Sequence, residues 1–293
     1  MQRPQEPTVP GTKIATIAVD GQILRVAIRR GSSERPPLLI FNGIGANLEL
    51  LAPFTLAVGD IETVIFDAPG AGGSPRPRLP YRFSMVARLA NRLMTQLGYT
   101  GQFDVLGVSW GGGLAQQFAR QYPYRCRRLV LAATAPGAVM IPGRLSVVWK
   151  LLSPRRYFDR EHLTKIGPGL YGGVFRRKPD LLLEHGRHIR PPRGLGYAYQ
   201  LVAAWGWTSI HWLHALRQST LVIAGSDDPI VPLANARIMA WLIPNADLYV
   251  IDDGHLFLVT RASEVAGVVR KFLTFERGGR HGPVSRIDCE AAG

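Results

Sequence analysis

The stretch G-V-S-W-G-G-G at residues 107–113 decides the fold of this chain. A mostly apolar run at residues 103–106 leads into it, and the segment L-A-Q-Q-F-A-R-Q-Y that follows has apolar residues at helical spacing. Gly107, Ser109 and Gly111 form the pattern G-x-S-x-G, which is typical of a sharp turn between a buried strand and a helix. Because strand and helix approach closely at such a turn, the two flanking positions must lack a Cβ atom. The stretch therefore predicts a strand-turn-helix unit with the serine at its tip.

A serine held in this way can act as a nucleophile. Its hydroxyl projects above the carboxyl end of the strand, and the first amides of the helix point at any anion that forms there. The hydroxyl needs a base to take its proton, and that base is in turn held by a carboxylate. The chain order Ser109, Asp228, His255 is that of α/β-hydrolases, with the acid and the histidine each following a late strand. We predict Ser109 as nucleophile, His255 as general base and acid, and Asp228 as the residue that orients His255.

Two carboxylates compete for the acid position. Asp228 directly precedes the proline of G-S-D-D-P, where hydrolases of this type usually hold their acid, and Asp227 is the alternative. Asp252 and Asp253 precede a glycine and are expected to form a turn. Of the seven histidines, His255 alone follows a terminal strand in a glycine-containing loop. The others fall in the predicted cap or the tail, and for His211 and His214 packing is the expected role.

The loop F-N-G-I-G at residues 41–45 follows an early buried strand. Its glycines permit close approach of the backbone, and this architecture places the second amide of an oxyanion hole here. We predict the backbone amides of Ile44 and of Trp110, the residue after the serine, as the two oxyanion donors. Asn42 stands where many hydrolases of this type carry histidine, so the anchoring of the loop is expected to differ. The alternative is an ordinary turn at a strand end.

Strands and helices alternate around this unit. Residues 12–29 alternate apolar and polar around Asp20-Gly21, which predicts an edge hairpin. Further runs predict buried strands, namely P-L-L-I-F (37–41), E-T-V-I-F-D (62–67), F-D-V-L-G-V (103–108), R-R-L-V-L-A-A-T (127–134), S-T-L-V-I-A-G (219–225) and A-D-L-Y-V-I-D (246–252). We predict an α/β class protein with the α/β-hydrolase fold: a mostly parallel central sheet flanked by helices, with a mainly helical cap inserted after the sixth strand.

The regular alternation stops between residues 137 and 216. This segment is amphipathic and rich in aromatic residues, and we predict that it forms the helical cap over the active site. A pocket under such a cap is apolar and poorly hydrated, which suits a hydrophobic acyl group. The alternative is that the aromatics only pack the cap onto the core. The predicted domains are a core of residues 1–136 and 217–276, the cap at 137–216 and a disordered tail at 277–293.

The composition limits the size of the core, the location and the partners that we expect. A chain of 293 residues with 46% hydrophobic content can bury one substantial core. No signal peptide or transmembrane segment is visible, which favours the cytoplasm. The formal net charge of +14 is spread along the chain without a nucleic-acid-binding signature. We therefore expect no nucleic-acid partner, and an anionic particle surface is the alternative to incidental basicity.

No metal or other cofactor is expected. The two cysteines, Cys126 and Cys289, stand at the end of a predicted helix and in the polar tail, where they predict neither a disulfide nor a metal site. The glycine-rich segment D-A-P-G-A-G-G-S at residues 67–74 lacks the G-K-[ST] ending of a phosphate-binding loop. We interpret it as a structural loop that borders the site.

Beyond the superfamily, the chain resembles the intracellular depolymerases of medium-chain-length polyhydroxyalkanoate from about residue 12 to 276. The resemblance is carried by F-N-G-I-G-A-N-L-E-L (41–50), G-V-S-W-G-G-G-L-A-Q-Q-F-A (107–119), L-V-L-A-A-T-A-P-G-A-V-M (129–140), S-P-R-R-Y (153–157), Y-G-G-V-F-R-R (171–177), G-W-T-S-I-H-W-L-H (206–214) and D-D-G-H-L-F-L (252–258). The cap segments are its specific part, because the elbow and the triad are shared by many unrelated activities.

The resemblance implies a serine hydrolase that acts on polyester granules and releases 3-hydroxyalkanoate monomers or oligomers, with its triad at Ser109, Asp228 and His255. We expect cleavage through an acyl-enzyme, a hydrophobic polyester or acyl ester as substrate, and association with granules in the cytoplasm. One alternative is a general carboxylesterase of soluble hydrophobic esters, and another is a non-catalytic granule-binding protein on a hydrolase scaffold. A serine nucleophile disfavours haloalkane dehalogenase and epoxide hydrolase chemistry.

Overall fold

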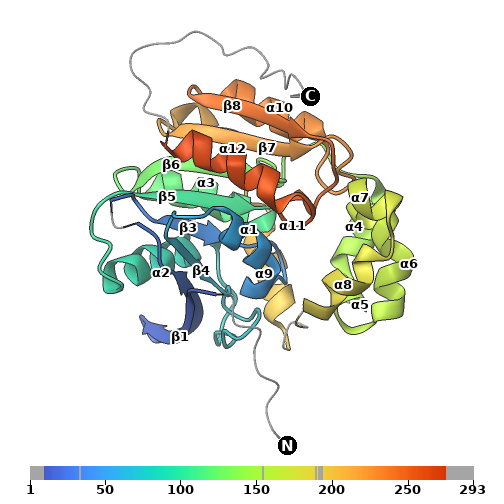
Figure 1. The fold of residues 1–293 in the computed structure, drawn as a ribbon, viewed down its shortest axis with the longest axis horizontal. Coiled ribbons are helices and arrows are strands. Elements are labelled where there is room, and N and C mark those ends of the chain that lie inside the picture. The colour runs from blue at the N-terminus through green and yellow to red at the C-terminus, as the bar shows by residue number, and fades with distance from the viewer. Residues whose placement is uncertain (1–9, 33, 154, 189, 191–193, 275–293) are drawn as a thin grey trace, which may run out of the picture.

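A central sheet of eight strands organises the structure, a computed structural model that describes residues 10–32, 34–153, 155–188, 190 and 194–274 (Figure 1). The strand order is β1-β2-β4-β3-β5-β6-β7-β8. The strands are β1 (Thr12–Val19), β2 (Gln22–Arg29), β3 (Leu38–Phe41), β4 (Thr63–Phe66), β5 (Phe103–Val108), β6 (Cys126–Ala132), β7 (Ser219–Gly225) and β8 (Ala246–Ile251). The two pairs that involve β2 are antiparallel and the other pairs are parallel. The predicted mostly parallel sheet is confirmed.

The predicted hairpin forms one edge of the sheet. Val19 pairs with Gln22, so the connection has two residues, and both of them, Asp20 and Gly21, have positive φ angles of 48° and 77°. Two consecutive positive φ angles match the turn whose twist suits a two-residue hairpin. Aspartate and glycine are among the residues that tolerate this conformation, which explains why this dipeptide marks the turn.

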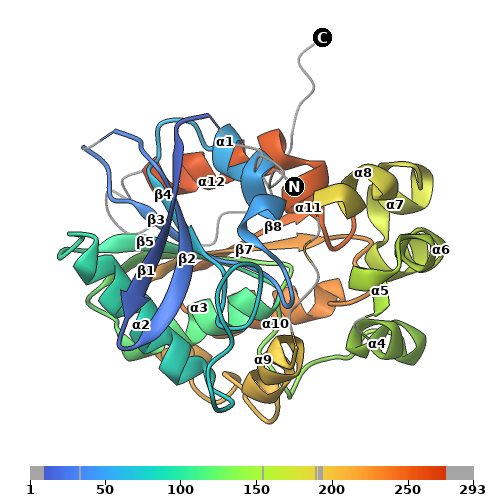
Figure 2. The same ribbon diagram turned by 90° about the horizontal axis from the view of Figure 1, so that it is seen from below.

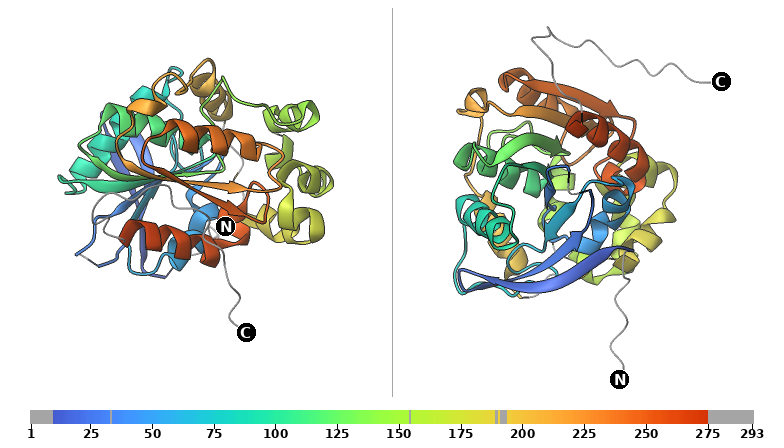
Figure 3. Two further views of the ribbon diagram at one scale, coloured as in Figure 1. Left: turned by 90° about the horizontal axis from the view of Figure 1, so that it is seen from above. Right: turned by 60° about the vertical axis from the view of Figure 1, so that its left-hand side comes forward.

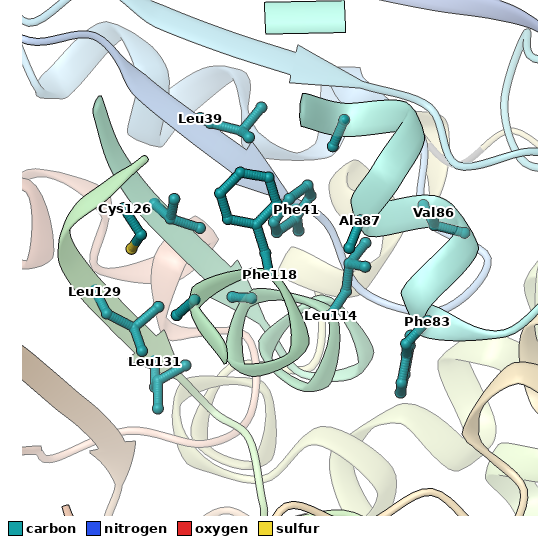
Figure 4. Close-up of a cluster of buried hydrophobic side chains, with 14 of the residues drawn as sticks. Leu39, Phe41, Phe83, Val86, Ala87, Leu114, Phe118, Cys126, Leu129 and Leu131 are labelled. Carbon is teal, nitrogen blue, oxygen red and sulfur yellow. The ribbon is translucent and has the colours of Figure 1, made fainter. Parts of the chain in front are cut away.

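Helices cover both faces of the twisted sheet (Figures 2 and 3). The helices are η1 (Leu48–Leu51), α1 (Ala52–Ala57), α2 (Phe83–Gln96), α3 (Trp110–Gln121), α10 (Leu233–Leu242), α11 (Phe257–Thr260) and α12 (Ala262–Thr274). One hydrophobic cluster packs α2, α3 and α10 against the sheet, and a second packs η1, α1, α11 and α12 against its other side. In Figure 4, Phe118 of α3 lies between Phe41 of β3 and Leu129 of β6. This packing fixes α3, and with it the turn that precedes the helix.

Helical structure fills the interval between β6 and β7. It contains α4 (Leu145–Leu152), α5 (Arg155–Phe158), α6 (Arg160–Tyr171), α7 (Gly173–Arg177), α8 (Leu181–His188), α9 (Gly196–Ala204) and η2 (Leu213–Ala215). Helices α4 to α8 lie together beside the carboxyl ends of the parallel strands (Figure 1), and α4, α6, α7 and α8 share a small hydrophobic cluster that also includes Ile230 from the loop after β7. Helix α9 instead contributes Tyr199 and Ala203 to the main core. The predicted helical insertion after the sixth strand is confirmed, and we propose residues 137–216 as one cap domain in two parts.

The described helices include none with the length and apolar character needed to cross a bilayer. Cys126 is buried in β6. The predicted disordered tail at 277–293, with Cys289, lies outside the described residues.

Candidate active site

Ser109 follows β5 in a backbone conformation that L-residues rarely adopt, with φ 54° and ψ −118°. Three hydrogen bonds hold it there. Its amide donates to the carbonyl of Ala132 (2.9 Å), and its carbonyl accepts from the amide of Gly112 (2.8 Å) and from Oγ1 of Thr134 (2.7 Å). The serine therefore lies at a strained turn whose conformation is imposed by its neighbours.

The flanking glycines leave room where strand and helix cross. A Cβ atom on Gly107 would lie 2.3 Å from the carbonyl oxygen of Gly111. A Cβ atom on Gly111 would lie 2.2 Å from the carbonyl oxygen of Phe41, at the end of β3. Both obstacles are backbone atoms, so any larger residue would displace a strand or the helix. The spacing of the two glycines thus follows from the close packing of β3, β5 and α3.

His255 lies within hydrogen-bond distance of both Ser109 and Asp228. His255 Nε2 is 3.1 Å from Ser109 Oγ, and His255 Nδ1 is 2.7 Å from Asp228 Oδ2. The other oxygen of Asp228 accepts from the amides of Ile230 and Val231, both at 2.9 Å. His255 and Asp228 are 5% and 7% exposed. A carboxylate fixed on Nδ1 favours the tautomer whose Nε2 can accept the serine proton.

The neighbouring carboxylates have other partners. Asp227 accepts from the amide of Gly173 (2.8 Å) and pairs with Arg176 (2.9 Å). Asp253 accepts from the amide of Val174 (2.7 Å) and from Gly254 within its own turn (2.7 Å). Both therefore bind the first turn of α7 in the cap. Asp228 is the carboxylate that contacts the histidine.

Two backbone amides beside the serine have no acceptor among the described residues. Within the part of the chain that the structure describes, neither the amide of Ile44 nor that of Trp110 donates a hydrogen bond. The loop that carries Ile44 lies against the serine, because a Cβ atom built on Gly43 would be 3.7 Å from Ser109 Cβ. Unpaired amides in this position are the groups that an oxyanion hole requires.

Asn42 anchors the loop at the position where many related hydrolases carry histidine. Its Nδ2 donates to the carbonyl of Asn47 (2.9 Å), and its Oδ1 accepts from the amide of Gly43 (2.8 Å). The side chain thus spans the loop and ties both of its ends. In this structure the loop is therefore anchored by an asparagine side chain.

A small cavity of about 80 Å³ opens beside the serine. Its walls are mostly apolar, and cap and core both contribute. The lining residues are Asn42, Gly43, Ile44, Ala46, Leu50, Leu51, Val108, Ser109, Leu151, Arg156, Tyr157, Tyr171, Ile230, His255, Leu256, Leu258 and Val259. The described residues contain no cluster of three His, Cys, Asp or Glu side chains arranged to hold a metal.

The glycine-rich segment 67–74 does not reach this cavity, so the prediction that it borders the site is wrong. Asp67 closes the segment into a loop by accepting from the amides of Leu48 and Gly73, both at 2.7 Å. The loop packs instead on the start of α9, where a Cβ atom on Gly196 would lie 1.9 Å from the carbonyl oxygen of Gly70. Its glycines serve this close contact.

Sequence reasoning missed the cap residues that contact the site. The carbonyl of Tyr171 accepts from the amide of His255 (2.7 Å), and the hydroxyl of Tyr157 donates to the carbonyl of Ile44 (2.7 Å). The sequence signals for them were the aromatic content of the cap and the segments S-P-R-R-Y and Y-G-G-V-F-R-R. Neither signal indicates which core residue a given aromatic would contact.

The sheet order, the helical insertion and the serine at the strand-helix turn define an α/β-hydrolase, a class of enzymes that includes many ester hydrolases. The family model described as alpha/beta hydrolase fold matches residues 36–262. The chain belongs to this family, in the branch that contains the poly(3-hydroxyalkanoate) depolymerase of Ectopseudomonas oleovorans. The two sequences are 56% identical over 263 residues, which cover 89% of this chain and 93% of the relative.

More distant relatives share the family but differ in their names. The 2-hydroxymuconate semialdehyde hydrolase of Pseudomonas putida is 33% identical over 181 residues, which cover 59% of this chain and 62% of the relative. Among solved structures, the enol-lactonase from Burkholderia xenovorans LB400 aligns with a TM-score of 0.76 and 23% identity over 89% of this chain and 100% of that one. The structural likeness supports the fold alone.

Proposed function

We propose that the protein is a serine hydrolase that cleaves the ester bonds of medium-chain-length polyhydroxyalkanoate. The observation that carries the proposal is the chain of hydrogen bonds from Ser109 through His255 to Asp228, beside an apolar cavity. The 56% identity to a poly(3-hydroxyalkanoate) depolymerase supports the substrate class. An apolar wall suits the alkyl side chains of such a polyester.

In the first half of the reaction, Ser109 Oγ attacks the ester carbonyl carbon while its proton passes to His255 Nε2. Asp228 stabilises the imidazolium that results, through the contact at Nδ1. The carbonyl oxygen becomes negatively charged and is bound by the amides of Ile44 and Trp110. Collapse of this intermediate breaks the ester bond, and His255 returns the proton to the departing hydroxyl end of the polymer.

In the second half, water replaces the polymer alcohol. His255 takes a proton from the water, whose oxygen attacks the acyl group on Ser109, and the same two amides bind the new oxyanion. Breakdown releases a carboxylic acid and restores the serine hydroxyl with the proton held on His255. The products are a 3-hydroxy acid, or an oligomer that ends in one, and a polymer chain with a free hydroxyl.

The size of the cavity implies that the cap moves. A space of about 80 Å³ is small beside the roughly 300–1,000 Å³ of sites that enclose a drug-sized ligand. Leu151 and Tyr157 of the cap form part of its wall. A polyester strand would therefore enter between cap and core as the cap shifts away from the serine.

The proposal includes association with polyester granules in the cytoplasm, as in the intracellular depolymerases that the chain resembles. The net charge of +14 suits an anionic granule coat. Large apolar side chains are exposed on the cap, with Leu145 and Trp149 one helical turn apart on α4 at 74% and 71% exposure. Such side chains suit contact with an apolar surface.

The small cavity also favours a second candidate, a carboxylesterase of soluble hydrophobic esters. Purified protein incubated with poly(3-hydroxyoctanoate) latex and with p-nitrophenyl octanoate separates the two functions. We expect the latex to clear and 3-hydroxy acids to appear, with both activities lost in Ser109→Ala. Rapid hydrolysis of the soluble ester with a latex that stays turbid would instead identify the carboxylesterase.

A further inference from the structure

We propose that Tyr157 and Gln200, two residues of the cap, position the oxyanion loop formed by Gly43, Ile44 and Gly45. The inference rests on the proposed function, in which the Ile44 amide binds the oxyanion. It assigns these two side chains a positioning role in the reaction, since each makes a hydrogen bond to the loop.

Both polar atoms of one peptide unit in the loop are bound by the cap. The carbonyl oxygen of Ile44 accepts from the hydroxyl of Tyr157 (2.7 Å), and the amide of Gly45 in the same peptide unit donates to Gln200 Oε1 (2.7 Å). This peptide unit directly follows the one that carries the amide of Ile44. Because both ends of the unit are fixed, it cannot rotate without losing a hydrogen bond, and the direction of the neighbouring amide is restricted.

The loop is shaped to receive Tyr157. Gly45 has a φ of 66°, a left-handed conformation that favours glycine. A Cβ atom at this position would lie 2.6 Å from the hydroxyl oxygen of Tyr157, so the tyrosine occupies the space that a side chain would need. Glycine at this position thus meets two requirements at once, the backbone turn and the contact with the cap.

Gln200 also contacts the other predicted oxyanion donor. Its backbone carbonyl accepts from Trp110 Nε1 (2.8 Å), and its side chain is fully buried. Gln200 Nε2 has no hydrogen-bond partner in the described part of the chain. An unpaired buried donor opposes folding, so an apolar residue would suit stability better. The presence of a side-chain amide at position 200 is explained by its oxygen, which accepts the hydrogen bond from the backbone amide of Gly45.

Arg156 fixes the direction of the tyrosine hydroxyl. Its Nη2 donates to Tyr157 OH (3.0 Å), and its guanidinium lies over the Tyr157 ring, 4.5 Å from the centroid. Since the hydroxyl accepts from this cation, its own proton is directed to Ile44. Arg156 is itself buried and donates to the carbonyls of Leu151 and Ser153 at the end of α4.

Tyr157 and Gln200 come from the two different parts of the cap. Tyr157 belongs to α5, in the group α4 to α8, whereas Gln200 belongs to α9, which packs with the core. The loop is therefore fully held only when α5 is seated against the core. This arrangement couples closure of the cap to the geometry of the oxyanion hole, so that the hole is ordered when the substrate is enclosed.

Three variants test the positioning role. Tyr157→Phe removes the hydroxyl but keeps the ring, and Gln200→Met removes Oε1 but keeps the backbone contact to Trp110. Tyr199→Phe is the matched control, because within the described residues the hydroxyl of Tyr199 accepts from Arg76 and donates to the carbonyl of Arg78, and makes no hydrogen bond to the oxyanion loop. The measurements are kcat and KM with p-nitrophenyl octanoate, the inhibition constant of octylboronic acid as a mimic of the tetrahedral intermediate, and Tm.

Each of the first two variants is expected to lower kcat about 10- to 100-fold, less than the loss of an oxyanion donor itself, with KM changed less than about threefold. The affinity for the boronic acid should fall in parallel with kcat. The double variant should lose less than the product of the two single losses, because both residues bind one peptide unit. The control should keep its kcat within about twofold.

The role is overturned if Tyr157→Phe and Gln200→Met lose no more kcat than Tyr199→Phe, or if their loss lies entirely in KM. It is also overturned if Tm and kcat fall together in all three variants, which would indicate a structural role. An active wild type with unaffected variants would refute the positioning role alone. A wild type without esterase activity would refute the proposed function and this inference with it.

Discussion

Ser109 occupies a backbone conformation that costs about 1–3 kcal/mol, and the neighbouring carbonyl and hydroxyl groups keep it there. This backbone conformation directs the Ser109 side chain out of the sheet towards His255, and Ser109 Oγ lies 3.1 Å from His255 Nε2. The same turn leaves the amide of Trp110 without an acceptor in the described part of the chain. One local conformation thus supplies both a nucleophile and a donor for the charge that its attack creates.

Substitution of two adjacent carboxylates tests which of them orients the histidine. Asp228→Asn should lower kcat about 10⁴-fold, the loss seen when the orienting carboxylate of another serine hydrolase becomes an amide, because an amide can hold the wrong imidazole tautomer. Asp227→Asn is the matched control and should keep kcat within about tenfold, since Asp227 contacts Gly173 and Arg176 of the cap. Steady-state kinetics on p-nitrophenyl octanoate gives both values. Equal losses in the two variants would contradict the assignment.

The sequence predicts Ser109, Asp228 and His255 because each follows a recognisable strand in the order that α/β-hydrolases use. No sequence motif or preceding strand identifies Tyr157 and Gln200 in this way. They lie 113 and 155 residues along the chain from the loop atoms that they bind, in a cap without a repeating strand pattern. Contacts of this kind depend on how the cap packs on the core, and local spacing carries no information about that packing.

At the scale of elements, the crossing of β3, β5 and α3 sets the limits on substitution. Gly111→Ala would place a Cβ atom 2.2 Å from the backbone of Phe41, and we expect the free energy of unfolding to fall by at least about 3 kcal/mol. Gly113→Ala, on the same helix, would meet side-chain atoms in place of backbone, the ring edges of Phe83 at 3.0 Å and of Trp207 at 3.2 Å. Alanine also favours a helix over glycine by about 1 kcal/mol, so the net change should stay within about 1 kcal/mol. Urea denaturation of the two variants provides the comparison, and similar losses would refute the packing argument.

A buried group of charges joins β2, η1 and the loop after β4. Arg25 pairs with Glu49 at 2.6 Å and with Asp67 at 3.3 Å. Burial raises the pKa of Asp67 from an ordinary value of 3.8 to about 6, against the opposing effects of hydrogen bonds from Gly73 and Leu48 and of the charge on Arg25. The folded chain therefore binds a proton at Asp67 at a higher pH than the unfolded chain does.

This shift has a definite sign in the pH dependence of stability. Since the folded pKa is the higher one, the contribution of Asp67 is fully present below about pH 4 and is lost as the pH rises through about 6. The free energy of unfolding of the wild type, minus that of Asp67→Asn, should fall by about 3 kcal/mol over this range. Urea denaturation of both proteins at a series of pH values measures the difference. A flat or rising difference would mean that Arg25 keeps Asp67 ionised throughout.

The central strands of the sheet are predictable because both of their faces are buried, which produces continuous apolar runs such as Leu38–Phe41. The role of α9 is not predictable in this way. The aromatic and aliphatic residues of α9 are compatible with a helix that packs within the cap and equally with a helix that packs on the core. The structure shows Tyr199 and Ala203 packed in the main core. The charge group around Arg25 also escapes prediction, because its members stand far apart in the sequence.

The whole molecule combines a net positive charge with large apolar side chains exposed on the cap, such as Leu145 and Trp149, and we expect both features to affect activity on particles more than activity on soluble esters. Raising the salt concentration from about 0.01 M to about 1 M shortens the Debye length from about 30 Å to about 3 Å. With a net charge of +14, clearing of poly(3-hydroxyoctanoate) latex coated with anionic phospholipid should slow several-fold over this range. Hydrolysis of p-nitrophenyl octanoate is the control and should keep its kcat/KM within about twofold. A coated latex that clears at the same rate at all salt concentrations would contradict electrostatic attraction to the particle.

The proposed enzymatic mechanism depends on a reactive serine at the turn between β5 and α3. A fluorophosphonate probe, which reacts with serines activated by a base, tests this most directly when the labelled peptide is identified by mass spectrometry. We expect one label on Ser109, which disappears in Ser109→Ala and slows by orders of magnitude in His255→Ala. A folded wild-type chain that takes up no label, or labels equally well without His255, would contradict the enzymatic mechanism.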